Sequence, residues 1–110
     1  MIDWKRVEEL REEIGADGFV EVADMFLDEA EGAVRALAGG LPAGEVESQL
    51  HFLKGSALNL GLSELAHICQ EGERKAAAGQ AVDTTQVAAI YDASRASLLG
   101  RLSAEQAGAA

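Results

Sequence analysis

Apolar residues recur along the chain at intervals of three and four, the spacing that lines one face of an α-helix. The longest such stripe runs through residues 19–37, and shorter stripes lie before and after it. The segment 39–44 combines glycines with the only proline of the chain and interrupts the pattern most clearly. The pattern predicts five helical segments, at about residues 4–14, 18–37, 45–60, 63–78 and 84–102.

Residues suited to helix ends stand at the boundaries of these segments. Asp3 and Asp17 precede the first two segments, and Asp83 or Thr84 begins the last, where Gln86 suits a capping box. Glycines that can adopt a left-handed conformation follow three of the segments: Gly15, Gly61 (with Asn59 before it) and Gly79. The apolar positions of the first segment, all expected to face the core, are Trp4, Val7, Leu10 and Ile14.

Four long amphipathic segments joined by short connections predict antiparallel packing. We therefore expect an all-α fold, an up-down-up-down four-helix bundle with the short first helix lying across one end. Residues 1–104 are expected to form a single domain, and residues 105–110 to fray as a tail. No long apolar stripe is left without a partner, which favours a monomer.

Composition narrows the possible partners and sites. The net charge of −10 argues against nucleic acid and anionic membranes, since both attract clustered lysine and arginine. Cys69 is the only cysteine, so no disulfide or thiolate metal site is expected, and it fits as a small core residue. No apolar run approaches the ~20 residues of a membrane span, and the first ten residues lack the apolar core of a signal peptide, so we expect a cytoplasmic protein.

The third segment has an unusual outward face. At about 100° of rotation per residue, His51 and Gly55 turn away from the core, one turn apart, and Lys54 projects from their flank. The residues that define the core side of this segment are Val46, Leu50, Leu53, Ala57 and Leu60. Three further residues, Phe52, Leu58 and Asn59, fall at or near the outward face.

Each of these features has an ordinary reading as a solvated surface residue, but together they suit one chemistry. A neutral imidazole is a good nucleophile near pH 7. A helical glycine costs about 1 kcal/mol relative to alanine, and the missing side chain at Gly55 would clear space for a partner that carries the electrophile. The Lys54 ammonium could meet an attached phosphoryl group, contributing about 1–4 kcal/mol at ~4 Å, depending on the effective dielectric.

The stretch HFLKGSALNLG, residues 51–61, resembles the signature of histidine-containing phosphotransfer (HPt) domains. The following LSELAHICQEGERKAA is similar to the next helix of that family, and VADMFLDEA, residues 22–30, to the segment before the signature. The resemblance covers roughly residues 17–78. It departs from the family pattern at three positions: Leu50 (often alanine), Phe52 (often small) and Gly72 (usually bulky and apolar).

The resemblance implies a phosphorelay intermediate. His51 would carry a phosphoryl group, on Nε2, reversibly between aspartates of response-regulator receiver domains, and a hybrid histidine kinase is a further expected partner. Lys54 would stabilise the phosphate, Gly55 would admit the receiver, and Phe52, Leu58 and Asn59 would belong to the docking surface. The receiver would supply Mg²⁺, so the chain itself is expected to need no cofactor or metal.

Two alternatives are weighed against this reading. A phosphorylation-independent helical adaptor could use the face of Phe52, Gly55 and Leu58, although the presence of both His51 and Lys54 favours the phosphoryl carrier. A self-phosphorylating kinase would need an ATP-binding domain, for which a helical bundle of this length leaves no room. The other histidine, His67, is expected to be an ordinary surface residue, because no further ligands stand at a spacing that would complete a metal site with it.

Overall fold

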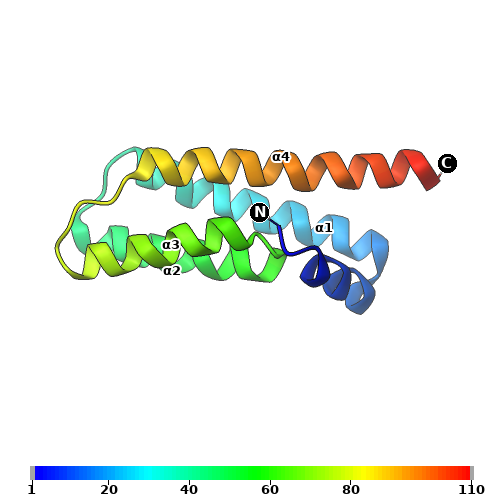
Figure 1. The fold of residues 1–110 in the computed structure, drawn as a ribbon, viewed down its shortest axis with the longest axis horizontal. Helices are drawn as coiled ribbons and strands as arrows, with labels where there is room; N and C mark the ends of the chain where they lie inside the picture. The colour runs from blue at the N-terminus through cyan, green and yellow to red at the C-terminus, as the bar shows by residue number, and fades with distance from the viewer. Residues whose placement is uncertain (1, 110) are drawn as a thin grey trace.

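The computed structural model describes residues 2–109, without the side chains of residues 43 and 105–109. Its four helices are α1 (Trp4–Ala38), α2 (Ala43–Leu60), α3 (Ser63–Ala77) and α4 (Thr84–Ala109). The long part of α1 and the other three helices run alternately in opposite directions along one axis (Figure 1). The predicted all-α, up-down-up-down bundle is confirmed.

Helix α1 contains the two segments that the sequence predicts, joined at a kink. Gly15 is the residue with non-helical dihedrals within α1, at φ 80° and ψ 159°. A positive φ is accessible to glycine at little cost, which explains the residue at this position. The N-cap predicted at Asp17 is wrong, because an N-cap residue is itself non-helical and here Gly15 has that geometry. Ile14, expected in the core, is 39% exposed beside the kink.

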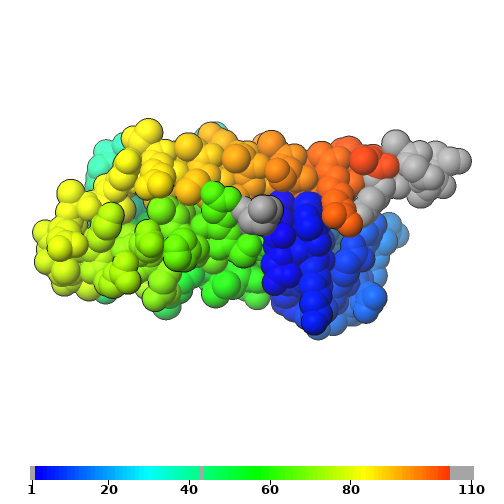
Figure 2. Space-filling model, viewed as in Figure 1, coloured from blue at the N-terminus to red at the C-terminus, as the bar shows by residue number. Residues whose placement is uncertain are grey.

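The segment before the kink lies across one end of the bundle, as expected. It meets the turn between α2 and α3, where the Asp3 amide donates to the Gly61 carbonyl at 2.7 Å. The buried Val7 and the ring of Trp4, over which the Arg101 guanidinium lies at 4.2 Å, attach the segment to the bundle. Figure 2 shows this dark blue segment covering the end of the α2–α3 pair and reaching α4.

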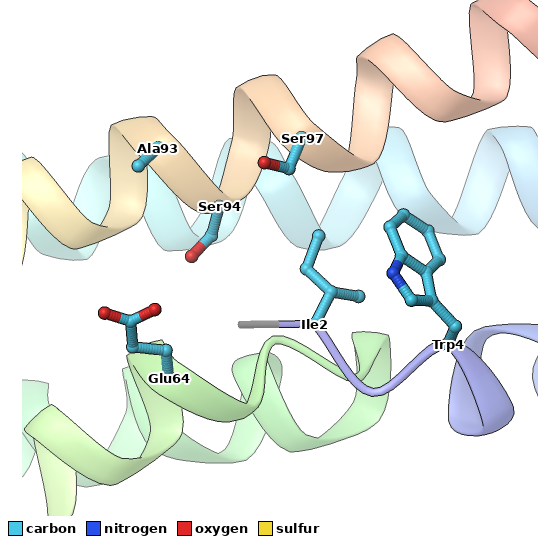
Figure 3. A pocket seen from close by; sticks show the side chains of 6 residues that line it. All are labelled: Ile2, Trp4, Glu64, Ala93, Ser94 and Ser97. Atoms are coloured by element: carbon cyan, nitrogen blue, oxygen red, sulfur yellow. The ribbon is translucent and has the colours of Figure 1, made fainter.

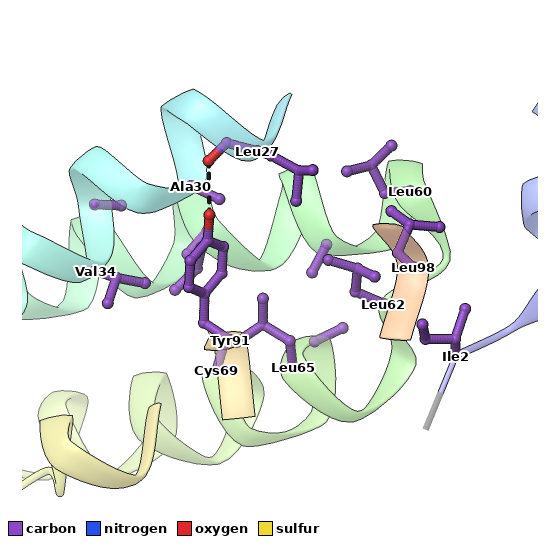
Figure 4. Packing of buried hydrophobic residues seen from close by; sticks show 14 of the residues in the cluster. Ile2, Leu27, Ala30, Val34, Leu60, Leu62, Leu65, Cys69, Tyr91 and Leu98 are labelled. Atoms are coloured by element: carbon purple, nitrogen blue, oxygen red, sulfur yellow. Dashed lines mark hydrogen bonds between the residues drawn. The ribbon is translucent and has the colours of Figure 1, made fainter. Parts of the chain in front are cut away.

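The core is formed by the inward stripes of all four helices (Figure 4). Tyr91 of α4 is its largest fully buried side chain, and its hydroxyl donates to the Leu27 carbonyl of α1 at 2.9 Å. A buried phenol needs such a partner, since an unsatisfied hydroxyl costs about 1–3 kcal/mol. Of the predicted inward residues of α2, Leu50, Leu53, Ala57 and Leu60 are buried, and Val46 is partly buried against the core.

The helix ends follow the predicted signals. Asp3 accepts a hydrogen bond from the Arg6 amide and Asp83 from the Gln86 amide, so both act as N-caps. Gly61 and Gly79 adopt positive φ where α2 and α3 end. Helix α4 continues to Ala109, so the fraying of residues 105–110 stays a prediction, and their side chains lie outside the described residues.

Two departures from the family pattern compensate for each other inside the bundle. Gly72 of α3 is buried, and a Cβ added there would lie 2.8 Å from Leu50 Cδ1 of α2. The leucine at position 50, where the family often has alanine, therefore fills the space left by a glycine where the family usually has a bulky residue. The exchange keeps α2 and α3 packed at the level of His51, which follows Leu50 along the chain.

Candidate functional site

The outward face of α2 carries the predicted site. The His51 side chain is 72% exposed and stands clear of the core. A Cβ added at Gly55 would have no non-neighbouring heavy atom within 4 Å, so the backbone one turn beyond the imidazole is open to an approaching molecule. The predicted exposure of both residues is confirmed.

Lys54 lies against α3. Its side chain is only 19% exposed, and its ammonium donates to Gln70 Oε1 at 3.0 Å and to Glu73 Oε2 at 3.3 Å. The Nζ atom also lies 3.1 Å from Glu73 Oε1. The cation beside the histidine is thus held by two side chains of the neighbouring helix.

Glu73 connects the histidine and the lysine. Its Oε2 lies 3.3 Å from His51 Nδ1 and 3.3 Å from Lys54 Nζ. Its Oε1 is buried and accepts no hydrogen bond from the described residues, so the 3.1 Å contact with Lys54 neutralises it by charge alone. Because a carboxylate only accepts, Nδ1 must carry the proton in this pair, which leaves the Nε2 lone pair of a neutral imidazole available.

Sequence reasoning missed Glu73 and Gln70, although a signal for them existed. Helices α2 and α3 are antiparallel and turn at Gly61. His51 precedes the turn by about as many residues as Glu73 follows it, so the two lie at the same level of the hairpin. The angular position of each side chain around its helix then decides which residues of α2 and α3 come into contact.

The other flank of His51 is a shallow depression between α1 and α2 of about 320 Å³. Phe52, predicted as a docking residue, is 46% exposed at this depression, and Gly55 and Asn59 also line it. Leu58 is 56% exposed but does not line the depression. The full lining consists of Phe26, Glu29, His51, Phe52, Gly55, Ser56 and Asn59.

A second hollow, of about 160 Å³, lies where the start of the chain meets α4 (Figure 3). Its lining comprises Ile2, Trp4, Glu64, Ala93, Ser94 and Ser97. It includes none of the predicted site residues and marks the seam along which the N-terminal segment packs on the bundle.

The remaining candidate groups lie elsewhere. His67 is 72% exposed on α3 and pairs with Glu71 at 3.2 Å, in agreement with an ordinary surface position. Cys69 is buried, as predicted; burial first, and then the Glu73 carboxylate, raise the pKa of its thiol to about 12. Within the described part of the chain, no three histidine, cysteine or acidic side chains are grouped as metal ligands would be. Nor is any helix in that part long and apolar enough to cross a membrane.

Comparison with known proteins agrees with the geometry of this site. The profile of the Hpt domain family matches residues 21–105, which include His51 and its partners on α3. The chain belongs to the Hpt domain family. This Hpt protein is also 32% identical over 96 residues to the phosphorelay protein LuxU of Vibrio vulnificus, from strain YJ016 and from strain CMCP6. Each match covers 84% of this chain and 84% of the relative. No solved structure gives a significant match.

Proposed function

We propose that this Hpt protein is a phosphorelay intermediate that carries a phosphoryl group on Nε2 of His51. The observation that carries the proposal is an exposed imidazole whose Nδ1 faces the Glu73 carboxylate, while none of the described side chains bonds to its Nε2. Membership of the Hpt family and the similarity to a phosphorelay protein support it. The donor and acceptor are aspartates of response-regulator receiver domains.

The transfer step balances with the groups at this site. The Nε2 lone pair attacks the phosphorus of a receiver phosphoaspartate, the P–O bond to that aspartate breaks, and its electron pair returns to the carboxylate. The product is a phosphoimidazolium that retains the Nδ1 proton, and its positive charge faces Glu73. The reverse step restores neutral imidazole as the leaving group. Glu73 therefore favours the reactive proton form of His51 in both directions.

Lys54 and Gly55 serve the same step in different ways. Phosphoryl transfer depends mainly on in-line positioning and on neutralisation of charge. The Lys54 ammonium, about one helical turn beyond His51 and linked to it through Glu73, is the cation available to a phosphoryl group on Nε2. Gly55 lets the receiver backbone and its Mg²⁺ site approach the imidazole, so the metal belongs to the partner.

Phosphoryl transfer from a receiver tests the assignment. The protein is incubated with a ³²P-labelled receiver domain, and acid-labile, base-stable label is measured on this chain. We expect His51→Gln to abolish the label, whereas the matched variant His67→Gln, which alters an equally exposed histidine, keeps it. His51→Gln should change the free energy of unfolding by no more than about 0.5 kcal/mol, because the side chain is exposed. Label that persists in His51→Gln would overturn the proposal.

A further inference from the structure

The two flanks of His51 differ in charge and polarity. On the α3 flank, Lys54 and Glu73 form an ion pair, with Nζ 3.1 Å from Oε1. On the α1 flank, the depression is bordered by the rings of Phe26 and Phe52 and by the carboxylate of Glu29. The first flank is already paired internally, whereas the second offers an apolar hollow with a single acidic group.

The Glu29 carboxylate is exposed at the edge of this depression. None of the side chains that the structure describes forms an ion pair or hydrogen bond with it, although α1 does form such pairs elsewhere. Glu31, two residues further along, binds Arg35 at 3.3 Å. An unpaired carboxylate beside a site that receives a phosphoryl dianion is unfavourable unless a cation compensates it. Lys54 is already paired with Glu73, so a basic residue of the molecule that docks is the cation that would compensate Glu29.

We propose that the α1–α2 depression selects among receiver domains by taking one apolar side chain while Glu29 pairs with a receiver lysine or arginine. This inference rests on the proposed function and identifies which receivers the same site accepts. The depression, of about 320 Å³, is bordered by the two phenylalanine rings, which offer an apolar surface to one aliphatic or aromatic side chain of a receiver.

The two contacts contribute differently to selection. The apolar contact is available to most receivers, since many surfaces can supply a leucine or a similar side chain. The charged contact discriminates, because a receiver with an acidic residue opposite Glu29 is repelled and one with a basic residue is attracted. Glu29 is thus a specificity-determining residue that does not take part in the chemical step.

The test uses purified receiver domains encoded in the same genome, each phosphorylated with acetyl phosphate. Transfer to the wild-type protein ranks the receivers and identifies the best donor. We expect Glu29→Lys to lower kcat/KM with that donor at least tenfold, through KM, and Glu29→Gln to lower it less. The loss in Glu29→Lys should shrink as salt is raised, because an exposed pair is screened.

Asp28→Lys is the matched control. It changes the net charge by the same amount on the same helix, but Asp28 does not line the depression. Asp28 instead lies toward α4, where it adds to the larger effect of burial in raising the pKa of Tyr91. We expect transfer to Asp28→Lys to stay within twofold of wild type. Far-ultraviolet circular dichroism of each variant confirms that the helices are intact.

The possible outcomes separate this inference from the proposed function. If wild type takes a His51-dependent label but Glu29→Lys and Asp28→Lys behave alike with every receiver, the phosphorelay function stands and selection by Glu29 is overturned. A receiver variant in which one lysine or arginine is replaced by glutamate supplies the complementary test. If it transfers poorly to the wild-type protein but well to Glu29→Lys, that receiver residue is the partner of Glu29. If wild type takes no label from any receiver, the proposed function fails and this inference fails with it.

Discussion

Gly55 and Gly72 both lie inside helices of the α2–α3 hairpin, but in opposite surroundings. A Cβ at Gly55 would enter open space, whereas one at Gly72 would lie 2.8 Å from Leu50 and 3.3 Å from Val82. Glycine weakens each helix by about 1 kcal/mol relative to alanine. The compensation at Gly72 is packing within the chain, and at Gly55 we assign it to contact with another molecule.

The two positions look alike in the sequence, but we expect one glycine to matter for stability and the other for binding a partner. The interior glycine is matched to a large neighbour, so enlarging it disturbs the fold. The exterior glycine is matched to nothing in the chain, so enlarging it should disturb only binding. The predictions below follow in order of decreasing expected effect.

The largest effects should be on stability, from substitutions of Gly72 and of its neighbour Leu50. Packing density in a core leaves no space for the side chain that Gly72→Leu adds, and overpacking costs about 1–3 kcal/mol. Leu50→Ala should cost about 2–5 kcal/mol alone, because it empties the same space from the other side. Urea denaturation followed by circular dichroism measures both.

The double variant Gly72→Leu with Leu50→Ala makes this prediction sharper. It moves the large side chain from position 50 of α2 to position 72 of α3. The loss in free energy of unfolding should therefore be at least about 1 kcal/mol smaller than the sum of the losses in the two single variants. Strictly additive free energies of unfolding would contradict the compensation between the two positions.

Gly55→Leu should leave stability unchanged, or raise it by up to about 1 kcal/mol through helix propensity. Transfer from a phosphorylated receiver should slow at least tenfold, because the new side chain stands where the partner approaches. Rapid-quench measurement of label on His51 gives the rate. Gly44→Leu is the matched control, since Gly44 lies in the same helix and is equally open; equal rates in the two variants would exclude clearance as the role of Gly55.

Glu73→Gln tests the contact between the Glu73 carboxylate of α3 and Nδ1 of the exposed His51. An amide can donate to Nδ1 as well as accept from it, so ¹⁵N NMR of His51 should show both neutral tautomers instead of one. Replacing the charge-assisted hydrogen bond by a neutral one, a difference of about 1 kcal/mol, should slow transfer roughly fivefold. Glu71→Gln, which affects only the pair with His67, is the control. Unchanged ¹⁵N shifts in Glu73→Gln would refute the assigned tautomer.

Cys69 should show the smallest effect near neutral pH. Burial, reinforced by Glu73 and partly offset by Lys54, raises the pKa of its thiol from 9.0 to about 12. The folded state therefore holds the proton more tightly, and this contribution to stability is complete below pH 9 and is lost as the pH rises toward 12. Native protein should resist iodoacetamide at pH 8 and react once unfolded; rapid labelling of the folded protein would disprove this.

Much of the fold follows from patterns within single helices. The apolar period places Leu50 and Leu53 inward and His51 and Gly55 outward, because rotation about a helix depends only on position along it. End signals at Asp3, Asp83 and Gly61 are local as well, and the structure contains them.

The remaining features depend on how helices meet, which no local pattern specifies. Glu73 reaches His51 and Lys54, and Glu29 borders the same histidine, only because the antiparallel helices bring distant residues to one level. Ile14 is exposed, and Gly15 rather than Asp17 has the non-helical geometry, because the first segment bends away across the bundle end. The helical period was enough to place His51 on the exposed face of its helix, whereas the residues that contact it are decided by the packing of one helix against another.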